Sequence, residues 1–174
     1  MNEAIHNALC ACLGLAPDSE QALSMIRQAY AEPENPPRPA RTADMVYWSL
    51  SPEYGPDPAL YGAEAAGGGF HTPSVSRFAA YQLLVVCYGP GCEANARRIR
   101  SFLFLDGRGF PRKILRDAGI SPVPDPPPPQ LLYEPEGSLW RRRADLTVSL
   151  RAAETLEASF RSAITTAPAV VIRR

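Results

Sequence analysis

The segment that decides the fold is RFAAYQLLVVCYGPGCEANARRIRSFLFL, residues 77–105. Its first part, Ala79 to Tyr88, is an apolar run that only Gln82 interrupts, which predicts a buried or mostly buried strand. Gly89-Pro90-Gly91 then breaks the strand, and Pro90, with its preset φ, suits the first position of a helix. The apolar residues after the break recur at helical spacing and define one helix face: Cys92, Ala96, Ile99 and Leu103. The segment thus predicts a central strand that turns directly into an amphipathic helix, and it contains no catalytic signature.

The chain has 174 residues, enough for one domain with a sizeable core, and we expect a single domain over residues 1–174. Hydrophobic residues make up 45% of it, as in soluble globular proteins. No apolar run approaches the ~20 residues that span a bilayer, so we expect no membrane contact. The N-terminus contains Glu3 and lacks the basic-then-apolar order of a signal peptide, which predicts a cytoplasmic location.

Charge is balanced overall, with 18 basic and 18 acidic residues, but it is unevenly spread. Residues 1–87 hold four Arg and nine acids, whereas residues 88–174 hold fourteen Lys or Arg and nine acids. This asymmetry could produce complementary surfaces between neighbouring subunits. Alternatively, the charges mix on folding and carry no meaning. The zero net charge argues against nucleic-acid binding as the main function, because such proteins usually carry a large basic excess.

In the N-terminal half, apolar spacing predicts a helix over 2–15 that Gly14 ends. Residues 21–30 fit a helix or a strand about equally well, and residues 32–39 are proline-rich and predict an extended linker. Residues 44–51 alternate as a strand does. Residues 52–76 are rich in Gly and Pro and lack periodicity. We expect them to form a long flexible loop between two paired strands.

In the C-terminal half, residues 111–118 predict a short helix with Gly119 just after it. A proline-rich link is expected over 121–130, because such a run fits neither a helix nor a central strand. The remaining expected elements are a short edge strand at 130–133, a turn at 134–138, an alternating half-buried strand at 140–150, a weak helix at 153–162 and a strand at 169–172. The order predicts an α+β fold, a mainly antiparallel sheet with helices packed against it.

The residues that most often carry chemistry form no recognisable site. Cys10 and Cys12 are two residues apart on a predicted helix and therefore diverge, while Cys87 and Cys92 fall in different elements. We interpret all of them as buried apolar thiols and expect no metal and no cofactor. His6 and His71 lack a neighbouring nucleophile signature. A small hydrolase that uses a Cys or His in the 52–76 loop is a third hypothesis for function.

Arginines gather in two main clusters, and a smaller basic pair lies between them. The clusters are Arg97, Arg98 and Arg100, and Arg141, Arg142 and Arg143, with Arg112 and Lys113 as the pair. Arginine pairs with carboxylates in a planar, bidentate way, which suits subunit interfaces as well as nucleic acid. The clusters could be solvated surface, a protein interface or DNA contacts. A small nucleic-acid-binding module that uses them is the alternative hypothesis for function.

Three features, in this order, resemble the neck or tail terminator proteins of tailed bacteriophages. They are the strand Tyr81-Gln82-Leu83-Leu84-Val85-Val86-Cys87-Tyr88-Gly89 with its following helix, the proline run 124–129, and Gly137-Ser138-x-Trp140-x3-Ala144-Asp145-Leu146-x-Val148. The short N-terminal helix and the proline-rich segment 32–39 also look like the opening of that family. The resemblance covers residues 1–150, and the 52–76 segment departs from it.

The resemblance implies a structural virion protein that performs no chemistry. Terminators of this kind look like hexameric rings that cap the tail tube and join it to the head connector or adaptor protein. DNA would pass through the lumen without specific binding. The protein would be assembled in the host cytoplasm and reside in the neck of the virion. Under this reading, the candidate subunit or lumen contacts are Arg97, Arg98, Arg100, Arg141, Arg142 and Arg143.

Overall fold

A computed structural model describes residues 1–29, 40–53, 59–66, 70–104 and 110–157. Its four helices and seven strands confirm the α+β class that the sequence predicts. In chain order the elements are α1 (Asn2–Leu13), α2 (Glu20–Met25), β1 (Ile26–Gln28), β2 (Met45–Pro52), β3 (Ala59–Ala66), β4 (Phe70–Tyr88), α3 (Cys92–Phe104), α4 (Phe110–Asp117), β5 (Ile120–Pro122), β6 (Gln130–Glu136) and β7 (Leu139–Glu157).

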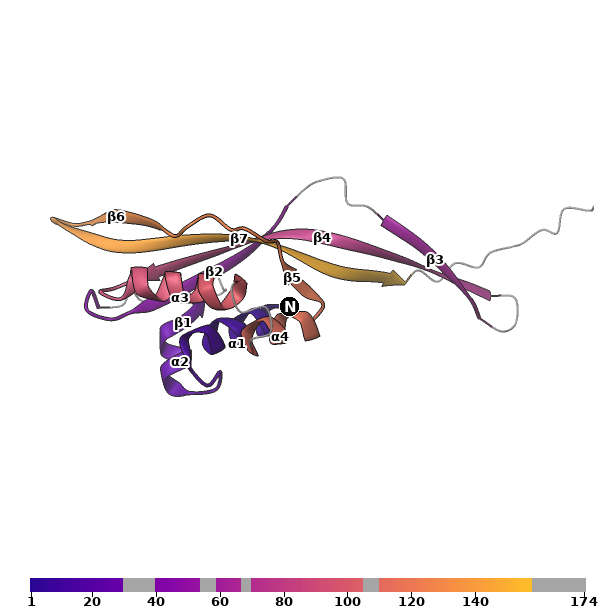
Figure 1. Cartoon of the computed structure of the whole chain (residues 1–174), viewed down its shortest axis with the longest axis horizontal. Coiled ribbons are helices and arrows are strands. Elements are labelled where there is room, and N and C mark those ends of the chain that lie inside the picture. Colours follow the sequence, from indigo (N-terminus) through magenta and orange to yellow (C-terminus); the bar gives the residue numbers. More distant parts are fainter. Residues whose placement is uncertain (30–39, 54–58, 67–69, 105–109, 158–174) are drawn as a thin grey trace, which may run out of the picture.

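Two 19-residue strands, β4 and β7, form the spine of the sheet. They pair antiparallel from Ser74 opposite Glu157 to Tyr88 opposite Arg143. The strand order is β1-β2-β4-β7-β5, with β3 paired to β4 and β6 paired to β7. Among the described strands only β1 and β2 pair in parallel, so the sheet is mainly antiparallel, as predicted. Figure 1 shows the long shape that results, with β6 at one end and β3 at the other.

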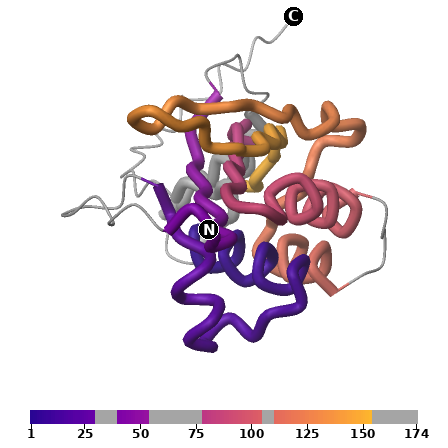
Figure 2. The backbone as a smooth tube through the Cα atoms, turned by 90° about the vertical axis from the view of Figure 1, so that its left-hand side faces the viewer, coloured from indigo at the N-terminus to yellow at the C-terminus, as the bar shows by residue number. Residues whose placement is uncertain are grey.

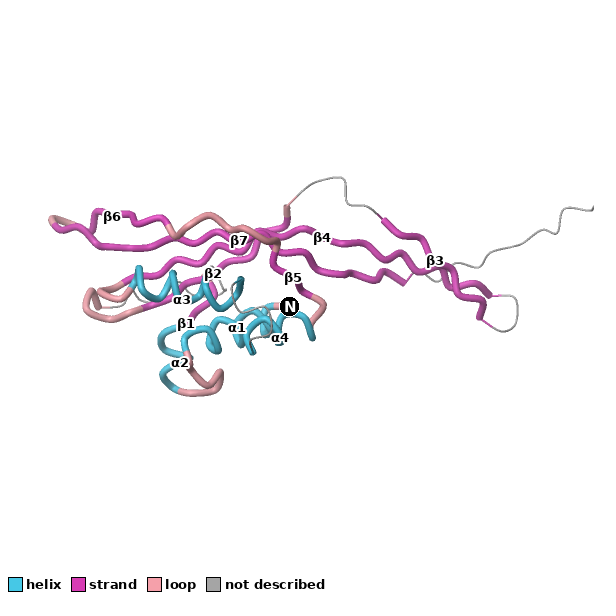
Figure 3. Tube along the Cα trace, in the orientation of Figure 1, coloured by secondary structure: helices cyan, strands magenta, loops and turns pink. Residues whose placement is uncertain are grey.

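All four helices lie on one face of this sheet (Figures 1 and 3). The sheet turns alternate side chains toward them, because successive residues of a strand point to opposite faces. On β7 the buried apolar residues of this face are Ala144, Leu146, Val148, Leu150 and Ala152, and the first four are the face that alternation in the sequence predicts. On α3 the buried residues are Cys92, Ala96, Ile99 and Leu103, again as predicted.

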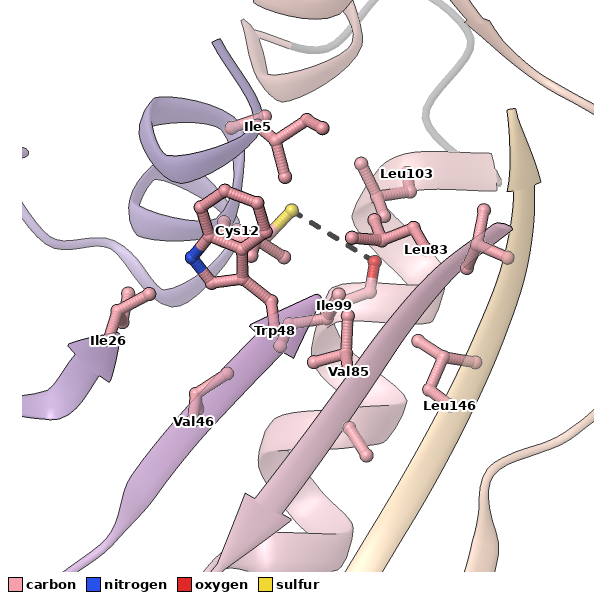
Figure 4. Packing of buried hydrophobic residues seen from close by; sticks show 14 of the residues in the cluster. Ile5, Cys12, Ile26, Val46, Trp48, Leu83, Val85, Ile99, Leu103 and Leu146 are labelled. Carbon is pink, nitrogen blue, oxygen red and sulfur yellow. Dashed lines mark hydrogen bonds between the residues drawn. The ribbon is translucent and has the colours of Figure 1, made fainter. Parts of the chain in front are cut away.

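Trp48 of β2 is the largest fully buried side chain of the core. Figure 4 shows it pointing from the sheet toward α1, in one cluster with Ile5 of α1 and with Ile99 of α3. The Cys12 thiol donates to the Ile99 carbonyl oxygen at 4.0 Å, which links α1 to α3. Strand β2, α1 and α3 therefore share one core.

The turn between β4 and α3 is held by a carboxylate from the chain segment before β2. The Gly91 N–H donates to Asp44 Oδ1 at 2.8 Å. Gly89 has φ +98, a conformation that residues with a Cβ rarely adopt. The helix begins at Cys92, so Pro90 lies in the turn and the expectation of Pro90 at the first helical position is wrong. The Asp44 hydrogen bond fixes the turn here, and this contact is long-range.

Gly14 and Gly119 end α1 and α4 as the sequence predicts, with φ +76 and +71. Residues 21–30, which fit a helix and a strand about equally well in the sequence, include both, because α2 ends at Met25 and β1 begins at Ile26. Ser19 caps α2 by accepting from the Ala22 N–H at 3.1 Å.

The expectation of one long loop over 52–76 is wrong for most of that segment. Residues Ala59–Ala66 form β3, and β4 already begins at Phe70, so the two strands pair as a hairpin. Small residues and Pro gave this stretch no sequence periodicity. Ladder hydrogen bonds to β4 satisfy the backbone nevertheless, because they involve main-chain groups and not side chains. Residues 54–58 and 67–69 lie outside the described residues.

Three further expectations change in the C-terminal half. The proposed turn at 134–138 is only Gly137-Ser138, because β6 extends to Glu136. The weak helix expected at 153–162 is wrong as far as 157, since pairing with β4 keeps β7 extended to that point. The proline-rich link expected at 121–130 is shorter, because its first residues belong to β5 and its last residue belongs to β6. The expected linker at 32–39 and strand at 169–172 lie outside the described residues.

The four cysteines are buried and free, as interpreted from the sequence. Burial raises the pKa of Cys12 to about 12, and it also raises the pKa of Cys87. We therefore expect the native protein at pH 8 to react far more slowly with a chromogenic disulfide reagent than the protein unfolded in guanidinium, which should release four equivalents. Rapid release of one equivalent from the native protein would contradict this packing.

Candidate assembly surfaces

Strand β6 and the start of β7 form a two-stranded arm, of which residues 133–142 lie beyond the end of β4. We define the arm as residues 130–142. Strand β4 ends at Tyr88, opposite Arg143, so residues 139–142 of β7 have only β6 as a neighbour among the described strands. The two strands join at Gly137-Ser138, where Gly137 has φ +63. In Figure 1 the arm forms the end of the molecule opposite β3.

The arm exposes large apolar side chains on both of its faces. Trp140 is 69% exposed, Tyr133 60% and Leu139 57%. Leu131 and Leu132 are also exposed. Neighbouring residues on a strand point to opposite faces, so Leu139 and Trp140 cannot both face the core. A cluster of this kind on a small protein usually marks an interaction site.

The charged residues at the base of the arm are paired within the chain. On the sheet face away from the helices, Arg143 donates to Asp145 Oδ2 at 2.7 Å and to Glu134 Oε2 at 3.5 Å. The Tyr88 hydroxyl donates to the same Glu134 oxygen at 3.0 Å. Burial and this hydrogen bond raise the pKa of Tyr88, so it stays a neutral donor. The network ties β6, β7 and β4 together.

Arg141 is only 7% exposed and stacks its guanidinium over the Tyr88 ring, 4.5 Å from the centroid. It also lies 3.7 Å from Glu136 Oε1. Arg41, from the segment before β2, donates to Glu136 Oε2 at 2.9 Å and to the Glu136 carbonyl oxygen at 2.7 Å. The tip of β6 is thereby fixed to a segment 95 residues earlier in the chain.

On the helix-covered face, Glu93 connects the two predicted arginine clusters. Arg142 of the arm donates to Glu93 Oε2 at 2.6 Å, and Arg97 of α3 pairs with Glu93 Oε1 at 2.8 Å. The arm is therefore braced from both sides. Such pairing makes it a preorganised surface that loses little entropy when it binds.

The other two candidate arginines have different surroundings. Arg98 is exposed and lies 5.8 Å from the centroid of the Phe102 ring. Arg100 is half-buried and donates to the Pro126 carbonyl oxygen at 3.0 Å, which holds the proline-rich link against α3. Of the six candidates, then, Arg98 has its charge most available for a contact with another chain.

Sequence reasoning overlooked the apolar arm and the carboxylates Glu134 and Glu136. A signal was present, because two large apolar residues follow the hairpin turn consecutively at Leu139-Trp140. Such a pair places one apolar side chain on each face of a strand. Arg41 carries no local signal, since only the tertiary fold brings it to Glu136.

The described residues contain no group of three His, Cys, Asp or Glu side chains able to hold a metal. Their helices also include none that is long and apolar enough to cross a membrane.

The comparisons with known proteins give one clear finding. A family model described as phage neck terminator protein matches residues 2–172, nearly the whole chain. A search of curated proteins gave no match. The family is a structural one and not an enzyme family, and its members are virion components. The chain therefore belongs to the phage neck terminator proteins, the structural family that its sequence resembles.

Proposed function

We propose that this protein forms a homo-oligomeric ring, most simply a hexamer, that caps the tail tube and joins it to the head connector or adaptor protein. DNA passes through its lumen without specific binding, and the ring is assembled in the host cytoplasm. The observation that carries the proposal is the arm, which projects from the sheet with Tyr133, Leu139 and Trp140 exposed. We assign the arm to the contact with the next protein along the neck.

The physical argument rests on solvent exposure and on rigidity. Covering apolar area gains about 25 cal/mol per Å², and aromatic residues dominate the binding energy of most interfaces. The charges at the base of the arm are already paired within the chain, so binding there does not have to desolvate unpaired ions. A stiff apolar arm with few free charges suits contact with protein better than contact with phosphate.

The same pairing weighs against the alternative of a nucleic-acid-binding module. Arg141, Arg142 and Arg143 each lie close to a carboxylate of their own chain. Replacing the three with alanine should therefore change DNA affinity little. A large, salt-dependent loss of DNA affinity in that triple variant would favour the alternative.

The direct test is size-exclusion chromatography with light scattering on the purified protein, alone and mixed with tail tube or head connector protein. We expect self-association into one closed species and a further complex with at least one of these partners. A strict monomer that joins neither partner at high concentration would refute the proposal.

Replacing Tyr133 and Trp140 together with serine should weaken binding to the tube or connector protein by about 30-fold or more. The reason is that a single aromatic hot spot contributes about 2 kcal/mol or more, which is already about 30-fold because 1.4 kcal/mol corresponds to tenfold. The matched control is Phe78→Ser, because Phe78 is 50% exposed but lies outside the arm. Titration calorimetry measures the binding. Equal affinities of the two variants would show that the arm is not the contact.

A further inference from the structure

The two sides of the helix layer carry opposite charge. Helix α1 contacts α3 and α4, whereas α2 contacts β1 and β2. In the end-on view of Figure 2, α2 accordingly lies on one side of α1, and α3 and α4 lie on the other. We call residues 1–25, which include α1 and α2, the acidic side, and α3 with α4 the basic side. The layer is thus open at two different edges.

The acidic side contains Glu3, Asp18 and Glu20 and has no Lys or Arg. All three carboxylate residues are exposed. Within the described part of the chain, none of them forms an ion pair. Their charge is therefore available to another molecule.

The basic side holds six Lys or Arg residues and two acids. Both acidic residues already form ion pairs within the chain, because Glu93 pairs with Arg97 and Asp117 pairs with Lys113. Arg98, Arg112 and Arg116 form no ion pair with any described residue. Arg112 and Arg116 are one helical turn apart and so share a face of α4. Arg100 also forms no ion pair with any described residue, but it donates to the Pro126 carbonyl oxygen. The basic side therefore carries an excess of cations, as the acidic side carries an excess of anions.

Each side also exposes large apolar side chains beside its charges. Leu23, which follows Glu20 on α2, is 59% exposed. Phe110 at the start of α4 is 69% exposed, and Phe102 of α3 is exposed as well. An apolar centre with a charged rim is the usual composition of a specific protein interface.

We propose that the acidic side of one copy packs against the basic side of the next copy in the ring. This inference rests on the proposed ring and names its subunit contact. Closed rings need a heterologous contact, in which one patch meets a different patch on the neighbour. Opposite charges on the two sides favour that contact and disfavour pairing of like sides, since like charges across an interface cost several kcal/mol.

The test uses two charge reversals on exposed or half-exposed residues. One variant carries Asp18→Arg and Glu20→Arg, and the other carries Arg112→Glu and Arg116→Glu. We expect each variant alone to self-associate about 10–100-fold more weakly than the native protein at low salt. Mixing the two should restore association, because each then offers the side that the other has lost. A chain that carries all four changes should also associate.

The control is Arg151→Glu, an exposed charge reversal on β7, which should leave association unchanged. Circular dichroism checks that each variant is folded. If one variant is unstable, association of the four-change chain still tests the contact, because that chain carries both reversed sides. If the native ring forms and both reversals leave it intact, the assignment of this contact is wrong while the proposed ring survives. If reversal at Arg112 and Arg116 lowers only DNA affinity, the basic side binds nucleic acid and the inference is also wrong. If the native chain never forms a ring, the proposed function itself fails.

Discussion

Replacing Trp48 with alanine is expected to lower the free energy of unfolding by about 3–5 kcal/mol, the range for removing a large buried aromatic. Trp48 is 2% exposed and packs in the cluster that joins β2 to α1 and α3 (Figure 4). Its Nε1 has no hydrogen-bond partner in the described part of the chain, so the cost comes from lost packing and from the cavity. Urea unfolding followed by circular dichroism measures the change.

The chain supplies its own control, because its other tryptophan is Trp140 on the arm. Trp140→Ala should change the free energy of unfolding by about 0.5 kcal/mol or less, as surface substitutions usually do. Fluorescence distinguishes the same two sites, since buried Trp48 should emit at shorter wavelength than exposed Trp140. Equal losses of stability in the two variants would contradict the packing described for β2.

Replacing Gly89 with alanine is expected to cost about 2–6 kcal/mol, for two reasons that add. Its φ of +98 is unfavourable for any residue with a Cβ, which costs about 1–3 kcal/mol. An added Cβ would also lie 2.5 Å from the Ala43 carbonyl oxygen and 2.9 Å from the Asp44 Cα. These are backbone atoms of the segment that braces the turn, so relief requires a backbone shift of the kind that costs about 1–3 kcal/mol.

Gly119→Ala is the matched control for this substitution. Gly119 has φ +71, but an added Cβ would meet no atom within 4 Å. It should therefore show the conformational cost alone, about 1–2 kcal/mol. Thermal unfolding of the two variants measures the difference. A loss at Gly119 as large as that at Gly89 would mean that contact with the 43–44 segment contributes nothing.

How far the sequence predicts the structure depends on whether the signal is local. The buried faces of α3 and of β7 were predicted correctly, because apolar period alone identifies them. The paired strands in 59–76 were not, since their hydrogen bonds come from the backbone of a distant partner and leave no side-chain pattern. The helix expected at 153–162 was wrong for the same reason, as pairing with β4 extends β7 to Glu157.

The candidate arginines illustrate the same limit for function. Composition drew attention to residues 141–143 as candidate contacts, but only the register of β6 against β7 places Glu134 and Glu136 beside them. The charge imbalance between the two halves of the sequence was visible from counting. Its separation onto two sides of one helix layer was not, because helix docking decides which charges become neighbours.

By itself the sequence determined the α+β class, the faces that become core, and the glycines that end α1 and α4. These follow from side-chain period and from backbone conformations that glycine alone adopts readily, both of which act within a few residues. The tertiary structure decided the length of the sheet, the exposed arm and the partner of each arginine. These depend on contacts such as Arg41 with Glu136, between residues 95 apart, and the fold alone brings such residues together.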